Sequence, residues 1–144
     1  MAYIERDIVI AAPMDVIYTY AGSPQTIPEW YVGIVDVQAD GVWPQVGGQA
    51  RITYHIAGIT LEVTATVLTY QPPYEFSFRM DGMVTGTSSW TYADEGGNTH
   101  VYVAFDYTLP GGVLGQMADK LVVDQLIASG EQSLANLKAI CESG

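Results

Sequence analysis

The chain has 144 residues, of which 49% are hydrophobic, and its five basic and sixteen acidic residues give a formal net charge of −11 at pH 7. This length and composition are typical of a folded domain with a sizeable core, so we expect residues 1–144 to form a single domain and not a disordered chain. The acidic balance argues against a nucleic-acid partner and against attraction to an anionic membrane, because both need clustered Lys and Arg.

Cysteine content and hydropathy limit the kinds of covalent cross-link, metal site and membrane association that we expect. Cys141 is the only cysteine, which excludes an intrachain disulfide framework and a thiolate metal cluster. No segment approaches ~18 uninterrupted apolar residues, and the N-terminus lacks a basic region followed by an apolar one. We therefore expect a cytoplasmic protein without stable membrane insertion, present as a monomer or a homodimer.

The N-terminal region predicts a strand followed at once by two short helices. The strand covers residues 8–10 and stops at an Ala-Ala-Pro sequence, and a short amphipathic helix then runs to about Gly22. A second short segment, interrupted by prolines, leads to Trp30 and Tyr31. Two abbreviated helices in this place are expected to close one end of a curved sheet around an apolar space.

The middle of the chain consists of runs in which apolar and polar residues alternate, separated by turn signals. This alternation predicts six further strands in an antiparallel sheet with one covered side and one solvent-facing side. Parity places the following residues on the covered side: Tyr54, Phe76, Phe78, Gly86, Ser88, Trp90, Tyr92 and Tyr107. On that side, the glycine and the serine are expected to be small gaps between the aromatic rings.

The opposite parity places Arg51, Arg79, His55 and His100 on the outer side. We expect both histidines to be exposed, and without clustered ligands at workable spacing they do not indicate a metal site. With no Arg directed inward, the sequence does not favour chemistry in which an Arg polarises a carbonyl group. A β-bulge would reverse this assignment, because a slip of one residue exchanges the two faces of a strand.

A long helix is predicted over residues 114–142, because no breaker except one glycine interrupts its period of 3.6 residues. At ~1.5 Å per residue such a helix can cross a whole sheet. Its covered stripe and flank carry these candidate contact residues: Val122, Gln125, Leu126 and Ser129.

The middle of this covered stripe is small. Ser129, Gly130 and Ser133 stand where bulky core residues are usual. Either the helix approaches the sheet closely there or a space remains, and the pattern alone leaves both possibilities open. Asp119, near the edge of the stripe, is expected to be a first-turn acid that complements the helix dipole.

Four stretches, which span nearly the full chain, carry a family resemblance: "IVIAAPMDVIYTYAGSP" with "IPEWYVGIVDV", "VGGQARITYHIAG", "VLTYQPPYEFSFRM", and "YTLPGGVLGQMADKL" with "SLANLKAICES". The sequence resembles the START/Bet v 1-like (SRPBCC) helix-grip superfamily, specifically its bacterial polyketide cyclase/dehydrase-like branch. The resemblance implies an α+β fold in which a seven-stranded curved antiparallel sheet wraps around the C-terminal helix and encloses a hydrophobic cavity. Family members bind lipids, sterols, quinones or polyketides, and some catalyse aromatic cyclisation or dehydration, so the resemblance is specific for fold and not for activity.

Parity and the resemblance together predict a binding site for a small apolar ligand such as a polyketide, lipid, quinone or isoprenoid. No catalytic residue, metal or cofactor is predicted. The candidate ligand-binding residues are Trp30, Tyr54, Phe76, Phe78, Ser88, Trp90, Tyr92, Tyr107, Val122, Gln125, Leu126 and Ser129.

Two other functions stay open at this point. One is a cyclase or dehydratase in which Tyr54, Trp90 or Tyr107 assists enolisation, and an inward ionisable group with a shifted pKa would favour it. The other is a domain that binds a protein partner, which would have a filled interior and an exposed apolar patch.

Overall fold

The computed structural model describes residues 2–56, 58–108 and 116–143. Its strands are β1 (Ala2–Ile10), β2 (Ile34–Ala39), β3 (Gln49–Ile56), β4 (Ile59–Gln71), β5 (Glu75–Gly82), β6 (Gly86–Glu95) and β7 (Asn98–Tyr107). Its helices are α1 (Met14–Gly22), α2 (Ile27–Trp30) and α3 (Gln116–Glu142). The predicted element order is confirmed, although β1 begins six residues earlier than the sequence pattern indicates. The side chain of Asp119 lies outside the described residues.

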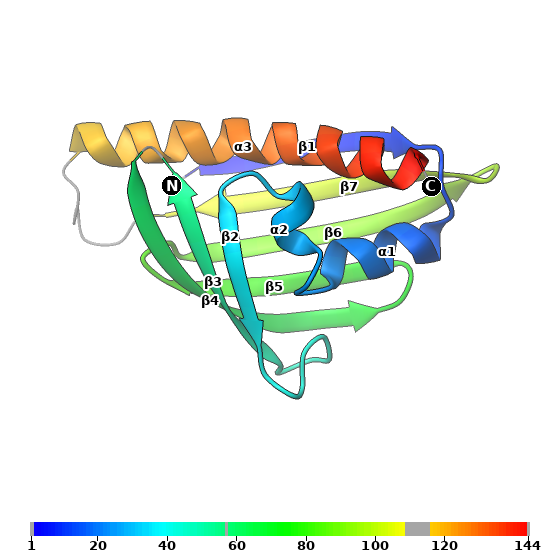
Figure 1. Ribbon diagram of the computed structural model, residues 1–144, viewed down its shortest axis with the longest axis horizontal. Coiled ribbons are helices and arrows are strands. Elements are labelled where there is room, and N and C mark those ends of the chain that lie inside the picture. The colour runs from blue at the N-terminus through cyan, green and yellow to red at the C-terminus, as the bar shows by residue number, and fades with distance from the viewer. Residues whose placement is uncertain (1, 57, 109–115, 144) are drawn as a thin grey trace.

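The seven strands form one antiparallel sheet in the order β1-β7-β6-β5-β4-β3-β2. Strands β2 to β7 follow one another as neighbours, and β1 returns to pair with β7 at the far edge. Figure 1 shows α3 running along the curved sheet beside β1, with α1 and α2 on the same side of the sheet. This is the α+β helix-grip arrangement that the resemblance implies.

Burial along the strands follows the predicted faces. In β3, Ile52 and Tyr54 are buried whereas Arg51 and His55 are exposed. Arg79 is exposed as well and donates to the carboxylate of Asp81 at 2.9 Å. The assignment of both arginines and of His55 to the outer side is therefore confirmed.

His100 also lies on the outer surface as expected, but it is partly covered and not fully exposed. Its Nε2 lies 2.6 Å from Asp7 Oδ2 and its Nδ1 lies 2.9 Å from Glu95 Oε2. Its ring stacks on Tyr102 with centroids 4.1 Å apart, and only 18% of its side chain is exposed. Hydrogen bonds to Asp7 and then Glu95 raise the pKa of the imidazole. Parity identifies the side of the sheet, but not the side chains that cover a residue on that side.

A β-bulge reverses the faces near the end of β4. The pairing with β5 shifts between Val67 and Thr69, which leaves Leu68 as an extra residue whose side chain is 43% exposed. Beyond the bulge Tyr70 pairs with Phe76 and packs against the core. Beyond the bulge, the side chains of β4 therefore face the side of the sheet opposite to the one that simple parity predicts.

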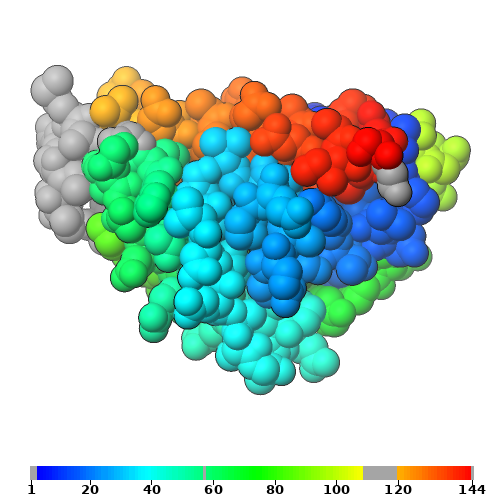
Figure 2. All heavy atoms as spheres, viewed as in Figure 1, coloured from blue at the N-terminus to red at the C-terminus, as the bar shows by residue number. Residues whose placement is uncertain are grey.

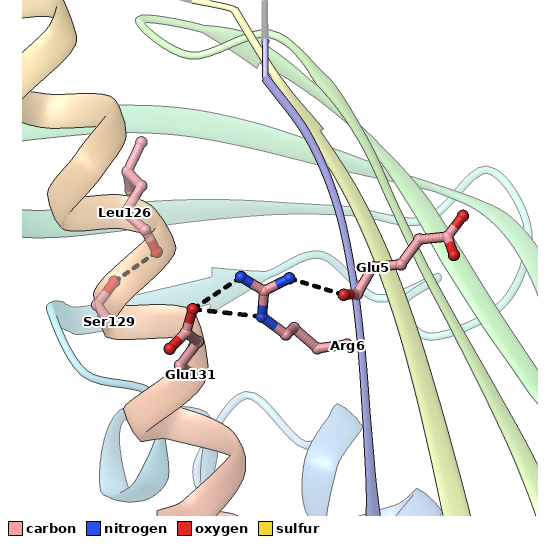
Figure 3. Close-up of polar contacts among 5 residues, drawn as sticks. All are labelled: Glu5, Arg6, Leu126, Ser129 and Glu131. Carbon is pink, nitrogen blue, oxygen red and sulfur yellow. Dashed lines mark hydrogen bonds and ion pairs between the residues drawn. The ribbon is translucent and has the colours of Figure 1, made fainter.

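Helix α3 packs on β1 and on the junction between α2 and β2. At β1, the guanidinium of Arg6 lies 2.8 Å from the carboxylate of Glu131 (Figure 3). At the junction, Ser133 Oγ accepts the backbone N–H of Val32 at 2.8 Å. Close to this bond, the amide of Asn136 donates to the carbonyl oxygen of residue 30 at 3.1 Å. The helix thus approaches the backbone of the junction closely.

The small residues in the middle of α3 are part of this close approach. Figure 3 shows the Ser129 hydroxyl turned back to its own helix, where it donates to the Leu126 carbonyl at 3.0 Å. A Cβ added to Gly130 would lie 4.0 Å from both the Phe105 ring and the Tyr31 hydroxyl. Of the two possibilities that the sequence leaves open, the structure has close packing at these positions.

The short helices and the β2–β3 loop (residues 40–48) cover the inner side of the sheet (Figure 1). Figure 2 shows their side chains as a continuous surface over the inner side of the sheet, in the view of Figure 1. Within the described residues, no helix combines the length and the apolar character needed to cross a bilayer.

Candidate functional site

A cavity of about 190 Å³ lies between the inner face of the sheet and the two short helices. The candidate residues from α2 and the strands all line it: Trp30, Tyr54, Phe76, Phe78, Ser88, Trp90, Tyr92 and Tyr107. Fifteen further residues complete the lining: Tyr18, Thr19, Ala21, Gly22, Ser23, Ile27, Tyr31, Ile34, Trp43, Pro44, Ile52, Tyr70, Pro72, Met80 and Phe105. That these side chains contact a ligand stays a prediction.

Three buried tyrosines, Tyr31, Tyr54 and Tyr107, lie close together in the cavity wall, and we call them the phenol cluster. The rings of Tyr31 and Tyr54 meet edge to face with centroids 6.2 Å apart. Burial is the main cause that raises the pKa of each phenol, and charge repulsion from a neighbouring phenol adds to the effect. The hydroxyls therefore stay protonated near neutral pH and act as neutral hydrogen-bonding groups.

Two indole N–H groups add to the polar part of the wall. The Trp90 N–H donates to Ser88 Oγ at 3.0 Å, and the serine keeps its own proton for donation. Trp30 is only 3% exposed, and its indole nitrogen has no hydrogen-bond partner within the described structure. A buried donor without an acceptor costs about 1–3 kcal/mol. Because this nitrogen is itself shielded from solvent, an acceptor in the cavity would reach it only after the indole moves.

Helix α1 is attached to the sheet through aromatic contacts. The Tyr18 hydroxyl donates to the Glu75 carbonyl at 2.8 Å. Its ring meets Phe76 and Tyr92 edge to face at centroid distances of 6.4 and 5.3 Å. Burial raises the pKa of Tyr18 to about 12. The roof of the cavity is thus held by aromatic packing and one hydrogen bond.

Charge is missing from the cavity wall as far as the structure describes it. None of the lining residues is Asp, Glu, His, Lys or Arg. No group of three or more His, Cys, Asp or Glu placed to hold a metal ion occurs in residues 2–56, 58–108 and 116–143. The wall is therefore apolar, with neutral hydrogen-bond donors as its polar groups.

The four candidates from α3 do not line the cavity: Val122, Gln125, Leu126 and Ser129. Gln125 is exposed to solvent, and the other three are buried in the packing of the helix. The physical reason is the close approach at Gly130, where Tyr31 and Phe105 fill the space beneath the helix. Their placement on the cavity wall is therefore wrong.

Three aromatic lining residues escape prediction from the sequence: Tyr18, Tyr70 and Trp43. Tyr70 reaches the cavity because the bulge at Leu68 reverses its face, and no residue type at that position announces the bulge. Trp43 belongs to the loop between β2 and β3, where alternation gives no information. An aromatic residue next to Pro44 in a glycine-rich loop is the one signal that could have indicated it.

The comparison with protein families assigns the chain. Residues 1–142 match the family described as polyketide cyclase / dehydrase and lipid transport. The chain belongs to this family. No curated protein matches the chain. The family match covers every element described above and confirms the predicted branch, whereas it does not choose between binding and catalysis.

Solved structures of other members of this fold are similar over nearly their full length. The Zhui aromatase/cyclase from Streptomyces sp. R1128 has a TM-score of 0.84 at 14% identity, with 98% of this chain and 93% of that chain covered. Major latex-like protein 151 from Panax ginseng has a TM-score of 0.72 at 14% sequence identity, with 97% of each chain covered. Ara h 8.0201 has a TM-score of 0.75 at 10% sequence identity, with 99% of each chain covered. These likenesses confirm the Bet v 1-like helix-grip fold.

Proposed function

We propose that this protein binds a compact, mostly apolar molecule that carries an oxygen atom, in the cavity between the sheet and the short helices. One observation carries the proposal: an aromatic cavity without a charged residue in its described lining holds the phenol cluster. Membership of the polyketide cyclase / dehydrase and lipid transport family supports it. Residues 1–144 would act as one ligand-binding domain, in the cytoplasm, as a monomer or a homodimer.

The size of the cavity limits the ligand. An apolar cavity of about 150 Å³ accepts benzene, whereas ordinary ligand pockets measure about 300–1,000 Å³. A cavity of about 190 Å³ therefore suits one ring or two fused rings. A quinone or a compact polyketide fragment fits this volume better than a long lipid or an extended isoprenoid.

Burial of such a ring system supplies the driving force. An aromatic group of this size removes about 150–250 Å² from water, which is worth about 4–6 kcal/mol at roughly 25 cal/mol per Å². Hydrogen bonds from the wall add to this value, and the entropic cost of association subtracts from it. We expect dissociation constants of roughly 10–1,000 µM.

The polar groups of the wall favour a neutral acceptor on the ligand. A ketone or quinone oxygen can accept hydrogen bonds from the hydroxyls of the phenol cluster. A carboxylate would lose its hydration without gaining a cation, because no Lys or Arg belongs to the described lining. The site therefore favours a carbonyl compound over an acid of the same size.

Calorimetric titration with 1-tetralone, a bicyclic ketone, tests the proposal. Tetralin has the same fused rings without the oxygen and is the matched control. We expect 1-tetralone to bind in the range given above and tetralin to bind about 3- to 10-fold more weakly. If neither compound gave a heat of binding or a thermal shift, the proposal would be contradicted.

A cyclase or dehydratase is the second candidate, because the groups that bind a ketone can also polarise it. Tyr54 and Tyr107 are available for this role, whereas the N–H of Trp90 is already bonded to Ser88. The raised pKa values of both phenols leave the described wall without a group that accepts a carbon-bound proton near neutral pH. This argues for binding without turnover.

Exchange of the C2 protons of 1-tetralone for deuterium, followed by NMR, separates the two functions. A binding protein leaves the exchange rate at its value in buffer. Acceleration that disappears in Tyr107→Phe would instead establish assisted enolisation. The third function, a domain that binds a protein partner, receives less support because it requires a filled interior in place of the cavity.

A further inference from the structure

A second pocket, of about 390 Å³ and more open to solvent than the first, adjoins it at the C-terminal end of α1. We call it the vestibule. It is formed by the segment after α1, strand β2 and the β2–β3 loop. The two cavities share Gly22, Ser23, Trp43 and Pro44. These four residues therefore form the boundary between an inner and an outer compartment.

Trp43 is the large side chain at this boundary. Its indole N–H donates to the Gly22 carbonyl at 3.1 Å. Its ring meets Phe76 edge to face, with centroids 5.5 Å apart and an interplanar angle of 71°. Phe76 lines the inner cavity and not the vestibule. One hydrogen bond and one aromatic contact thus hold the indole between the two compartments.

The loop that carries Trp43 is fixed at both of its ends. Asp40 Oδ1 accepts the backbone N–H groups of Val42 and Trp43, each at 2.9 Å. At the other end, Val67 of β4 donates its N–H to the Gly48 carbonyl at 2.9 Å. Because the backbone is held on either side of the indole, rotation of the Trp43 side chain is the simplest way to connect the compartments.

The two compartments differ in polarity. The described wall of the inner cavity is aromatic and carries no charge, whereas the vestibule contains the amide of Gln25 and the carboxylate of Asp40. No Lys or Arg belongs to the described lining of the vestibule. The chain as a whole has a net charge of −11, which disfavours an anion at this opening.

Building on the proposed function, we propose that Trp43 is a specificity-determining gate between two compartments of one binding site. The inner cavity takes the ring system of the ligand, and the vestibule takes an uncharged polar chain of a few atoms attached to it. The indole rotates to let the ring system pass and then packs beside the chain. The ligand class is therefore a compact ring compound with a neutral hydroxylated or amide substituent.

Three naphthalene compounds test the polarity of the vestibule. 2-Naphthol fills the inner cavity alone, 2-(2-naphthyloxy)ethanol adds a short neutral chain, and 2-naphthoxyacetate adds an anionic chain of the same length. By calorimetry, we expect the alcohol to bind at least as tightly as 2-naphthol and about tenfold more tightly than the carboxylate. Equal affinities of the alcohol and the carboxylate would overturn the assignment of the vestibule.

Variants of Trp43 test the gate through binding kinetics. In Trp43→Ala we expect the association and dissociation rate constants of 2-naphthol to rise about tenfold together, because one hydrogen bond and one ring contact are lost. Because Trp43 also lines the inner cavity, the dissociation constant should rise as well, but by a smaller factor than either rate constant. Trp43→Phe keeps a ring against Phe76 without the N–H, so its rates should rise less, by about threefold.

Val46→Ala is the matched control, because Val46 is on the same loop, is 61% exposed and lines neither cavity. Its rates should equal those of the wild type. Rates that stay unchanged in both Trp43 variants, while 2-naphthol still binds, would overturn the gate and leave the proposed function standing. Trp43→Phe decides the test alone if Trp43→Ala does not fold. Absence of binding by 1-tetralone and by all three naphthalene compounds would contradict the proposed function and the gate together.

Discussion

The sheet and helix α3 enclose the same interior, but they contribute to it in opposite ways. On the sheet, inward side chains such as Tyr54, Trp90 and Tyr107 line an open cavity. On α3, the inward residues are packed against their neighbours, as the hydrogen bond from Val32 to Ser133 shows. The described wall of the cavity therefore consists of the sheet, the short helices and their loops, and residues 120–142 of α3 support this wall without lining it.

This difference shows what the two-residue period of a strand and the 3.6-residue period of a helix reveal about the interior. Alternation along a strand identifies the covered side of the sheet, and residues on that side line the cavity where one is present. A helical stripe likewise identifies the covered side of α3, but the segment that covers it comes from residues about a hundred positions earlier. The predictions below test this division, from the largest expected effect to the smallest.

Gly86 leaves no room for a side chain, contrary to its expected role as a gap in the cavity. It does not line the cavity, its φ is +143°, and an added Cβ would clash with the Asp106 carbonyl oxygen. Gly86→Ala should therefore lower the free energy of unfolding by at least about 3 kcal/mol, measured by urea denaturation. Gly41→Ala, where nothing lies within 4 Å of an added Cβ, should change it by less than about 0.5 kcal/mol. A loss below about 1 kcal/mol at Gly86 would show that this part of the sheet can yield.

A serine-to-valine substitution should have unequal effects on stability in α3 and in the sheet. Ser133→Val adds bulk to the packed side of α3 and removes the acceptor of the Val32 N–H, so it should cost about 2–3 kcal/mol. Ser88→Val adds the same bulk beside the cavity and removes the acceptor of the Trp90 N–H, so it should cost about 1 kcal/mol. Urea denaturation of both variants measures the difference. Equal losses would mean that α3 is no more tightly packed than the sheet wall.

The fold could be predicted from the sequence because its elements are marked locally. The alternating runs, the turns between them and the two short helices after the first strand are each visible within about ten residues. Parity also placed Tyr54, Trp90 and Tyr107 in the wall where the structure has them.

The rest of the candidate site depends on contacts that no local pattern encodes. Tyr70 faces the cavity because one extra residue, Leu68, interrupts the pairing of two strands. Trp43 reaches the cavity from a loop, and its position is set by hydrogen bonds to Asp40 and to the end of α1. Gln125 lies on the predicted flank of α3 but is exposed, since a helical period does not report how wide the covered stripe is.

Removal of one hydroxyl from the phenol cluster should weaken ketone binding without a large effect on stability. Tyr107→Phe removes a donor from the wall, so the dissociation constant of 1-tetralone should rise about 2- to 10-fold, whereas that of tetralin should stay unchanged. Tyr102→Phe, on the opposite face of the same strand and 43% exposed, is the matched control and should alter neither. Calorimetry with both ligands measures these values. An equal loss for tetralin would mean that the hydroxyl shapes the cavity and does not bind the ketone oxygen.

The smallest effect concerns pH, and it should separate the outer face of the sheet from the inner one. Hydrogen bonds to Asp7 and Glu95 raise the pKa of His100 above its ordinary value of 6.5, so the folded protein binds this proton more tightly than the unfolded chain. The resulting stability is fully present below about pH 6.5 and is lost as the pH rises through the higher pKa of the folded state. The free energy of unfolding of the wild type should therefore exceed that of His100→Gln most clearly between about pH 5 and 6.5, with the difference shrinking at higher pH. The affinity for 1-tetralone should be constant from about pH 6 to 9, because the raised pKa values keep the phenol cluster neutral over that range. A stability difference that grows as the pH rises would show that His100 is bound as the neutral imidazole, with the two carboxylates held by other groups.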